Sequence, residues 1–164
     1  MEERRLQEGC QSRTQGGEEV KRTRTRTLRG QLTVTAGGTA KQQLIVDDGL
    51  INRGYKIVNW YLWENGGSPT QFCATLSMQP VIAGNDMDAS DNTQIGWIWQ
   101  SNITQGGGIK ETILDPDHII VRDLFVTIMN ANNDDYNFMI VVEEYDITND
   151  EAIINIIKEG SQSL

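Results

Sequence analysis

The single histidine of the chain, His118, follows Asp115, Pro116 and Asp117, and this group is the nearest the sequence comes to a catalytic set. A carboxylate three residues before an imidazole could orient that ring as a general base. However, no serine or cysteine with the surroundings of a nucleophile accompanies it, and Asp followed by Pro is typical of a turn. We therefore interpret the segment as a turn that leads into a strand opening at His118, and we do not expect an enzyme.

A second group of polar residues has the chemistry of a calcium ligand set. Asp86, Asp88 and Asp91 supply the hard oxygen atoms that Ca²⁺ prefers. An EF-hand loop starting at Asp86 would need Gly at its sixth position and Glu at its twelfth, where the sequence has Asp91 and Trp97. The chain also has no His and Cys cluster suited to zinc and no glycine-rich phosphate loop. We predict a solvated loop here, with no metal and no cofactor.

Basic residues alternate with threonine near the start of the chain. They are Lys21, Arg22, Arg24, Arg26 and Arg29. Residues 1–30 carry eight Lys or Arg against five Asp or Glu, and the rest carries six against eighteen, so a net charge of +3 precedes one of −12. A terminal block of one sign is typical of an interaction tail. Two surfaces of opposite sign could receive it: a nucleic acid backbone, or the acidic body of a neighbouring copy of the chain.

Residues 1–27 are predicted to form a basic extended arm, because the first 20 residues hold almost no large apolar side chains and cannot order themselves alone. From position 22 to 35 the residues alternate strictly between two faces, and in the second half of this segment one face is apolar and the other polar. This pattern predicts a half-buried strand. Its apolar face carries Leu28, Leu32 and Val34. Arg22, Arg24 and Arg26 continue that same face, an unusual position for guanidinium groups. We therefore expect the first half of this strand to project past the edge of the domain.

Residues 28–164 are predicted to form one domain, an all-β antiparallel sandwich for which a jelly roll is the leading topology. Alternating apolar runs separated by turn signals predict further strands at 41–46, 55–63, 72–78, 94–99, 109–114, 118–129 and 138–145. Thr148, with Glu151 three residues later, forms a capping box. A C-terminal helix is therefore expected over 149–159, with its isoleucine stripe packed on the sandwich.

Four tryptophans fall on these expected strands: Trp60, Trp63, Trp97 and Trp99. Tryptophan on a strand is most often part of the core. Trp60 and Trp63 differ in parity, however, so they cannot share one face of a regular strand. We expect one of them to contact a partner, since tryptophan is enriched at interface hot spots. Stacking on a sugar or a base is the rival use of these rings.

Length and hydropathy limit the remaining classes of protein. A chain of 164 residues suits one domain with a sizeable core. No run of about 18 apolar residues is present, so we expect no membrane partner. The first residues also lack the apolar core of a signal peptide, which favours synthesis in the cytoplasm.

Four strings resemble a group of small structural proteins encoded by uncultured marine viruses and phages. They are LRGQ at 28–31, INRGYKIVNW at 51–60, ILDPDHIIVRDLF at 113–125 and DEAIINIIKEGSQ at 150–162. The resemblance spans roughly residues 28–162 and leaves out the arm. It implies a virion component, a capsid protein with a jelly-roll core.

These observations lead us to expect a capsid protein that assembles with copies of itself into a shell within the virion, after synthesis in the host cytoplasm. The arm would contact neighbouring subunits first and the viral genome second, and other virion proteins are further candidate partners. The alternative is a virion decoration or receptor-binding protein with a glycan site at Trp63, Trp97 or Trp99. Both a major shell protein and a minor component of the shell fit these features.

Overall fold

The computed structural model describes most of the chain from position 22 onward: residues 22–46, 52–66, 71–81, 87–101, 109–130, 132–148, 150, 153, 154 and 157. Nine β-strands occupy this part. They are β1 (Arg22–Val34), β2 (Thr39–Leu44), β3 (Arg53–Glu64), β4 (Phe72–Ser77), β5 (Gln94–Gln100), β6 (Lys110–Leu114), β7 (Ile119–Ile120), β8 (Leu124–Asn130) and β9 (Asp134–Asp146).

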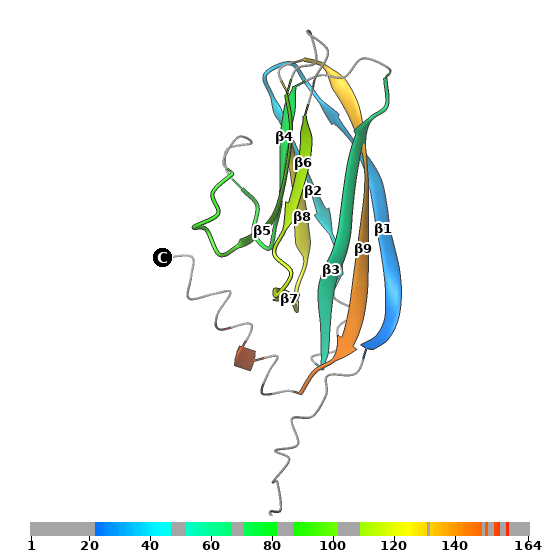
Figure 1. The fold of residues 1–164 in the computed structure, drawn as a ribbon, viewed down its shortest axis with the longest axis vertical. Helices are drawn as coiled ribbons and strands as arrows, with labels where there is room; N and C mark the ends of the chain where they lie inside the picture. The colour runs from blue at the N-terminus through cyan, green and yellow to red at the C-terminus, as the bar shows by residue number, and fades with distance from the viewer. Residues whose placement is uncertain are drawn as a thin grey trace, which may run out of the picture.

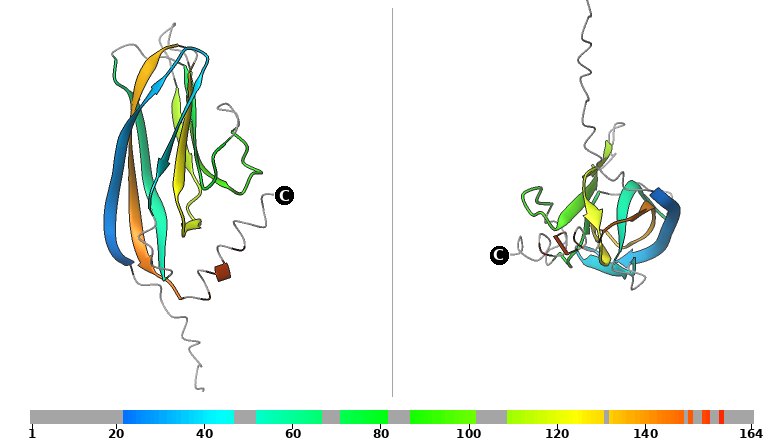
Figure 2. Two further views of the ribbon diagram at one scale, coloured as in Figure 1. Left: turned by 180° about the vertical axis from the view of Figure 1, so that it is seen from behind. Right: turned by 90° about the horizontal axis from the view of Figure 1, so that it is seen from below.

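The strands form two antiparallel sheets that face each other as a β-sandwich. Sheet A has the order β1-β9-β3-β7, and sheet B has the order β2-β8-β4-β5-β6. Figures 1 and 2 show the sheets as two layers, with β1, β3 and β9 in one and β4, β5 and β8 in the other. The prediction of an all-β antiparallel sandwich is therefore confirmed.

One continuous apolar core fills the space between the sheets. Strand β9 contributes every second side chain to it: Tyr136, Phe138, Ile140 and Val142 are at most 1% exposed. Strands β4 and β8 supply the facing layer through Phe72, Ala74, Leu76, Leu124, Val126 and Ile128. Full burial of such a side chain contributes about 1.5 to 3 kcal/mol, so this alternation holds the two layers together.

The turn between β1 and β2 depends on one glycine. The Gly38 N–H donates to the Thr35 carbonyl at 2.8 Å, and Gly37 has a φ of 66°. A positive φ at the third residue of a turn is the mark of a type II turn, which glycine adopts without steric cost. The turn carries the chain from sheet A to sheet B.

The prediction of one long strand at 118–129 is wrong. The chain instead forms β7 in sheet A, leaves it over Val121 to Asp123, and continues as β8 in sheet B. Val121 is buried, but in a small cluster with Ile147 that is separate from the main core. The alternation of apolar residues in the sequence continues across the crossing, because β7 faces the core from sheet A and β8 faces it from sheet B. The pattern therefore looks like one long strand.

The predicted C-terminal helix over 149–159 falls mostly outside the described residues. Asp150, Ile153, Ile154 and Ile157 are described, and each has helical backbone. The three isoleucines expose 50%, 50% and 60% of their surface. The expectation that this stripe packs on the sandwich is therefore wrong for these three side chains, which take no part in the core.

Candidate functional site

Strand β1 is paired along its length, from Arg22 opposite Tyr145 to Val34 opposite Asp134. It is an edge strand of sheet A, and its first half does not project past the domain. That prediction is wrong, and the strand begins inside the segment assigned to the arm. The predicted faces are confirmed, because Val34 is buried and Leu28 and Leu32 pack against the core from the same side. Arg24 and Arg26 therefore point inward at the end of the sandwich.

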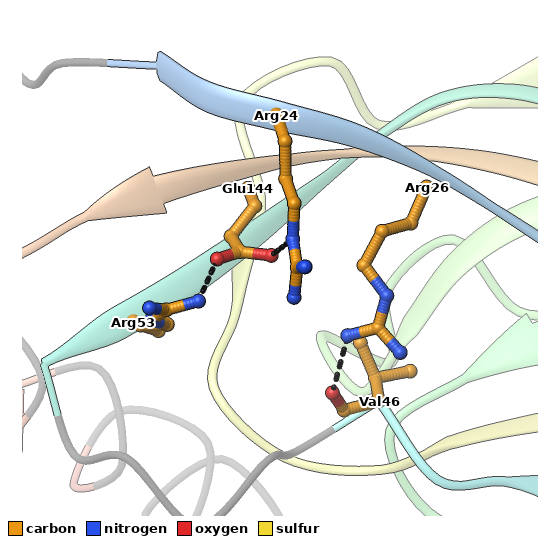
Figure 3. Close-up of polar contacts among 5 residues, drawn as sticks. All are labelled: Arg24, Arg26, Val46, Arg53 and Glu144. Atoms are coloured by element: carbon orange, nitrogen blue, oxygen red, sulfur yellow. Dashed lines mark hydrogen bonds and ion pairs between the residues drawn. The ribbon is translucent and has the colours of Figure 1, made fainter.

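A buried carboxylate on β9 accounts for the inward position of Arg24. Glu144 is fully buried, and its Oε2 accepts a hydrogen bond from Arg24 Nε at 2.5 Å. Its Oε1 accepts a second bond from Arg53 Nη1 on β3. Figure 3 shows the carboxylate between the two guanidinium groups. Three adjacent strands of sheet A are thus tied together by one ion-pair network.

Arg26 is held by different contacts. Its guanidinium carbon lies 5.7 Å from the centre of the Tyr55 ring, and its Nη1 donates to the Val46 carbonyl at 3.4 Å. The first is a cation–π contact, and the second reaches the segment that follows β2 in the other sheet (Figure 3). Arg26 therefore joins the two sheets where the sandwich ends.

A buried charge is tolerated only when it is paired and hydrogen-bonded. Glu144 meets this condition through both oxygens, and the arginines remain partly hydrated, since 55% of the Arg24 side chain and 28% of the Arg53 side chain are exposed. The sequence held a signal for the network. Glu144 continues the apolar face of β9 in the same way that Arg24 continues the apolar face of β1, and the two strands are neighbours.

The other basic residues of the predicted arm site do not join this network. Arg29 lies on the opposite face of β1, exposed and opposite Met139 of β9. Lys21 lies outside the described residues, and so does the side chain of Arg22. The structure thus separates two arginines with internal contacts, Arg24 and Arg26, from one that faces outward.

The four tryptophans fall in three places: the core, the outer face of sheet A and the outer face of sheet B. Trp60 is in the core at 2% exposure, whereas Trp63 is 46% exposed on the outer face of sheet A with Val58 and Tyr61. The register of β3 against β9 shifts between Ile57 and Asn59, and this β-bulge leaves Val58 and its neighbour both pointing outward. The opposite placement of Trp60 and Trp63 is therefore confirmed.

Trp97 and Trp99 lie together on the outer face of sheet B, each partly exposed. The Trp97 Nε1–H donates to Gln94 Oε1 at 2.8 Å, and the Trp99 Nε1–H donates to Glu111 Oε2 at 3.2 Å. These bonds fix the polar edges of both indoles. The structure brings these two tryptophans together and leaves Trp63 on the other sheet.

The turn interpretation of His118 is confirmed. Asp117 N–H donates to Asp115 Oδ1 at 3.0 Å, and β7 begins one residue after the histidine. The ring lies with Nε2 3.0 Å from Met78 Sδ and Nδ1 3.8 Å from Asp115 Oδ2. Burial lowers the pKa of His118, and the nearby Asp115 carboxylate partly offsets this effect.

The acidic loop is also locally satisfied where it is described. Asp88 Oδ1 accepts from the Ser90 N–H and hydroxyl, and Asp91 Oδ1 accepts from the same two groups of Thr93. Asp86 lies outside the described residues. Across the described ranges, no three His, Cys, Asp or Glu side chains are grouped so as to hold a metal ion. Over the same ranges, no helix is long and apolar enough to cross a membrane.

No protein-family model matches the chain, and no curated protein matches it.

Proposed function

We propose that this chain is a viral capsid protein that assembles with copies of itself into a shell, and that its sandwich is a jelly roll. In a jelly roll, one long antiparallel ribbon is folded over on itself, so that the first strand pairs with the last and the innermost two strands pair with each other. Many viral capsid domains have this topology.

The observation that carries the proposal is the nesting of strand pairs. Leaving β6 aside as an extra edge strand, the ribbon pairs are β1 with β9, β2 with β8, β3 with β7 and β4 with β5. Each pair lies inside the previous one along the chain. The two sheets arise where the ribbon rolls up, which brings β9 beside β3 and β8 beside β4.

Fold alone does not determine function, because jelly rolls also serve lectins and enzymes. Two further observations favour a capsid. The first is the resemblance of residues 28–162 to viral structural proteins. The second is the charge pattern, in which a basic N-terminal segment precedes an acidic domain. About 20 extended residues reach about 65 Å, far enough to cross a neighbouring subunit.

The pairing of β1 sharpens the experiment that tests this proposal. Removing residues 1–27 would also remove Arg24 and half of an edge strand, so a folding defect would be mistaken for an assembly defect. Removing residues 1–21 leaves β1 whole. We expect the truncated chain to keep the melting temperature of the full chain within a few degrees and to lose or alter its particles in electron microscopy and light scattering.

Preparing the full chain with and without nuclease treatment distinguishes the two partners of the arm. Particles that form without nucleic acid support contact with neighbouring subunits, and particles that require it support the genome. A full chain that stays monomeric at high concentration, with and without nucleic acid, contradicts the capsid proposal. Unchanged particles from the truncated chain contradict the role of the arm.

A further inference from the structure

A hollow of about 230 Å³ opens on the outer face of sheet B, where β4 begins and β5 and β8 end. It is lined by Gln71, Phe72, Cys73, Trp99, Gln100 and Met129. Its origin is visible in the strand register. Cys73 lies opposite Trp99 on one side and opposite Met129 on the other, so a small side chain forms the floor between two large ones.

The Trp99 wall of this hollow is held in place. Its indole N–H is bonded to Glu111 on β6, the next strand of the sheet. The polar edge of the ring is therefore occupied within the protein, and the ring face is the part left to contact a ligand. The face of an indole is electron-rich, so it attracts the weakly positive C–H groups of an apolar ligand face.

An amide side chain lies beside this aromatic wall. Gln71 is exposed just before β4. The Gln100 side chain takes the other face of the sheet, because Gln100 is paired with the buried Phe72 and its amide nitrogen lies 3.4 Å from Glu64 Oε1 of sheet A. A side-chain amide offers both donors and an acceptor, the combination that pairs with hydroxyl groups. A ligand that suits the whole hollow has an apolar face on one side and hydroxyl groups at its rim.

None of the six lining residues is charged at neutral pH. Burial raises the pKa of the Cys73 thiol, so the floor stays neutral. Glu111 at the margin and the −12 of the chain beyond residue 30 disfavour a phosphate group. This argues against a nucleotide base stacked on Trp99, since single-stranded nucleic acid sites combine aromatic rings with a positive groove.

Size restricts the ligand further. Pockets for drug-sized ligands measure about 300 to 1,000 Å³, and this hollow is smaller. One saturated six-membered ring is the scale that suits it. Trp97, two residues away on the same strand and facing the same side, offers a second ring surface next to the first.

We propose that this hollow binds one uncharged pyranose ring of a glycan, with the ring's C–H face on Trp99 and its hydroxyl groups at the rim bonded to Gln71. The proposal goes beyond self-assembly and does not depend on it, because the lining comes from a single chain. It also selects Trp99 from the four tryptophans and leaves Trp63 outside the site.

The test uses the full chain on an array of immobilised glycans ending in uncharged pyranoses such as glucose, galactose, mannose, fucose and N-acetylglucosamine. Trp99→Ala is compared with Trp63→Ala, which removes a more exposed side chain of the same type from the outer face of sheet A. We expect Trp99→Ala to weaken binding at least about tenfold, which corresponds to about 1.4 kcal/mol. Trp63→Ala should stay within about twofold of the full chain.

Two further variants guard against a folding defect. Trp99→Phe keeps a ring face and should retain most of the binding, whereas Cys73→Met raises the floor and should abolish it. Circular dichroism and melting curves establish that each variant is folded. The proposal is overturned if the full chain retains no uncharged glycan, or if Trp99→Ala and Trp63→Ala lose binding equally. Loss of self-association in Trp99→Ala, with no glycan bound by the full chain, also overturns it and assigns the hollow to a second copy.

Discussion

At the scale of single residues, the buried network of Glu144 explains how an edge strand can carry inward-pointing arginines. Charged side chains that point inward on an edge strand also discourage other strands from pairing with it, because they do not fit a foreign apolar surface. Arg24 therefore combines two properties. It pairs with Glu144 inside sheet A. It also places a charge on the edge strand β1, which disfavours pairing of that edge with a strand of another chain.

Glu144→Gln should lower the free energy of unfolding by about 2 to 3 kcal/mol. Breaking a buried pair costs roughly 3 to 5 kcal/mol, and the partial exposure of both arginines reduces that cost. Urea unfolding measures the change. The matched control is Glu143→Gln, on the outer face of the same strand, with an expected change below about 1 kcal/mol. The double variant Arg24→Gln with Glu144→Gln should lose less free energy of unfolding than the sum of the losses in the two single variants. A loss equal to that sum would contradict the network.

His118 should make stability depend on pH. Burial lowers the pKa of the folded ring below its ordinary value of 6.5. As the pH falls below that value, unfolded chains bind a proton that folded chains do not yet bind, so stability decreases. The urea midpoint of the full chain should fall more steeply between pH 7 and pH 5 than that of His118→Gln. Parallel curves for the two chains would show that the ring is not perturbed.

At the scale of elements, the β-bulge in β3 determines which aromatic side chains are inside. On either side of it the strand alternates regularly, with Tyr55 and Ile57 buried before the bulge and Trp60 and Leu62 buried after it. Because Val58 is the extra residue, the pairing with β9 is regular on both sides of it. The bulge shifts the faces by one residue, so Tyr61 and Trp63 become exposed.

Deletion of Val58 should therefore be tolerated, which is unusual for a strand paired on both sides. The deletion joins two segments that are already in register, and the buried set stays the same. We expect a folded protein that is less stable by about 2 kcal/mol or less, the scale of an ordinary substitution. Deletion of Tyr61 is the control, because it turns Trp63 toward the core side and breaks the pairing beyond it. Circular dichroism and thermal melting compare the two, and an unfolded Val58 deletion would contradict the bulge.

The sequence revealed most elements through alternation, and it failed where alternation was interrupted. The faces of β1 follow from Leu28, Leu32 and Val34 alone, since nothing disturbs the period there. The crossing from β7 to β8 was missed because Val121 is as apolar as a strand residue and is buried in a cluster of its own. The hollow beside Trp99 depends on Cys73 lying between two long side chains, and this register is not visible in one strand.

At the scale of the whole molecule, the surface charge of the N-terminal segment is smaller than its composition suggests. Arg24 and Arg26 have contacts within the domain, and Arg29, which follows the predicted arm, has a side chain that faces outward. Contacts with a neighbouring copy or with nucleic acid would therefore rest on Arg29 together with the residues before β1.

Arg29→Gln and Arg24→Gln should consequently affect different properties, the first self-association and the second stability. Arg29→Gln should leave the free energy of unfolding within about 0.5 kcal/mol of the full chain, as expected of an exposed position, and should weaken self-association. Arg24→Gln should lower stability through the loss of its bond to Glu144. Urea unfolding and analytical ultracentrifugation separate the two effects. Unchanged association in Arg29→Gln would exclude this residue as a contact.

The nested pairing of strands has a consequence for how the chain is made. Arg24 and Glu144 are 120 residues apart, so the first strand to leave the ribosome must wait for the last before sheet A can close. Contacts between residues far apart in the sequence slow folding. Until β9 has been synthesised, incomplete chains expose apolar surface and unpaired strand edges. Among the described strands, β4 with β5 and β5 with β6 are close enough in the chain to pair early. We therefore expect newly made chains to need protection until β9 emerges, and shortened chains that lack β9 to aggregate rather than fold.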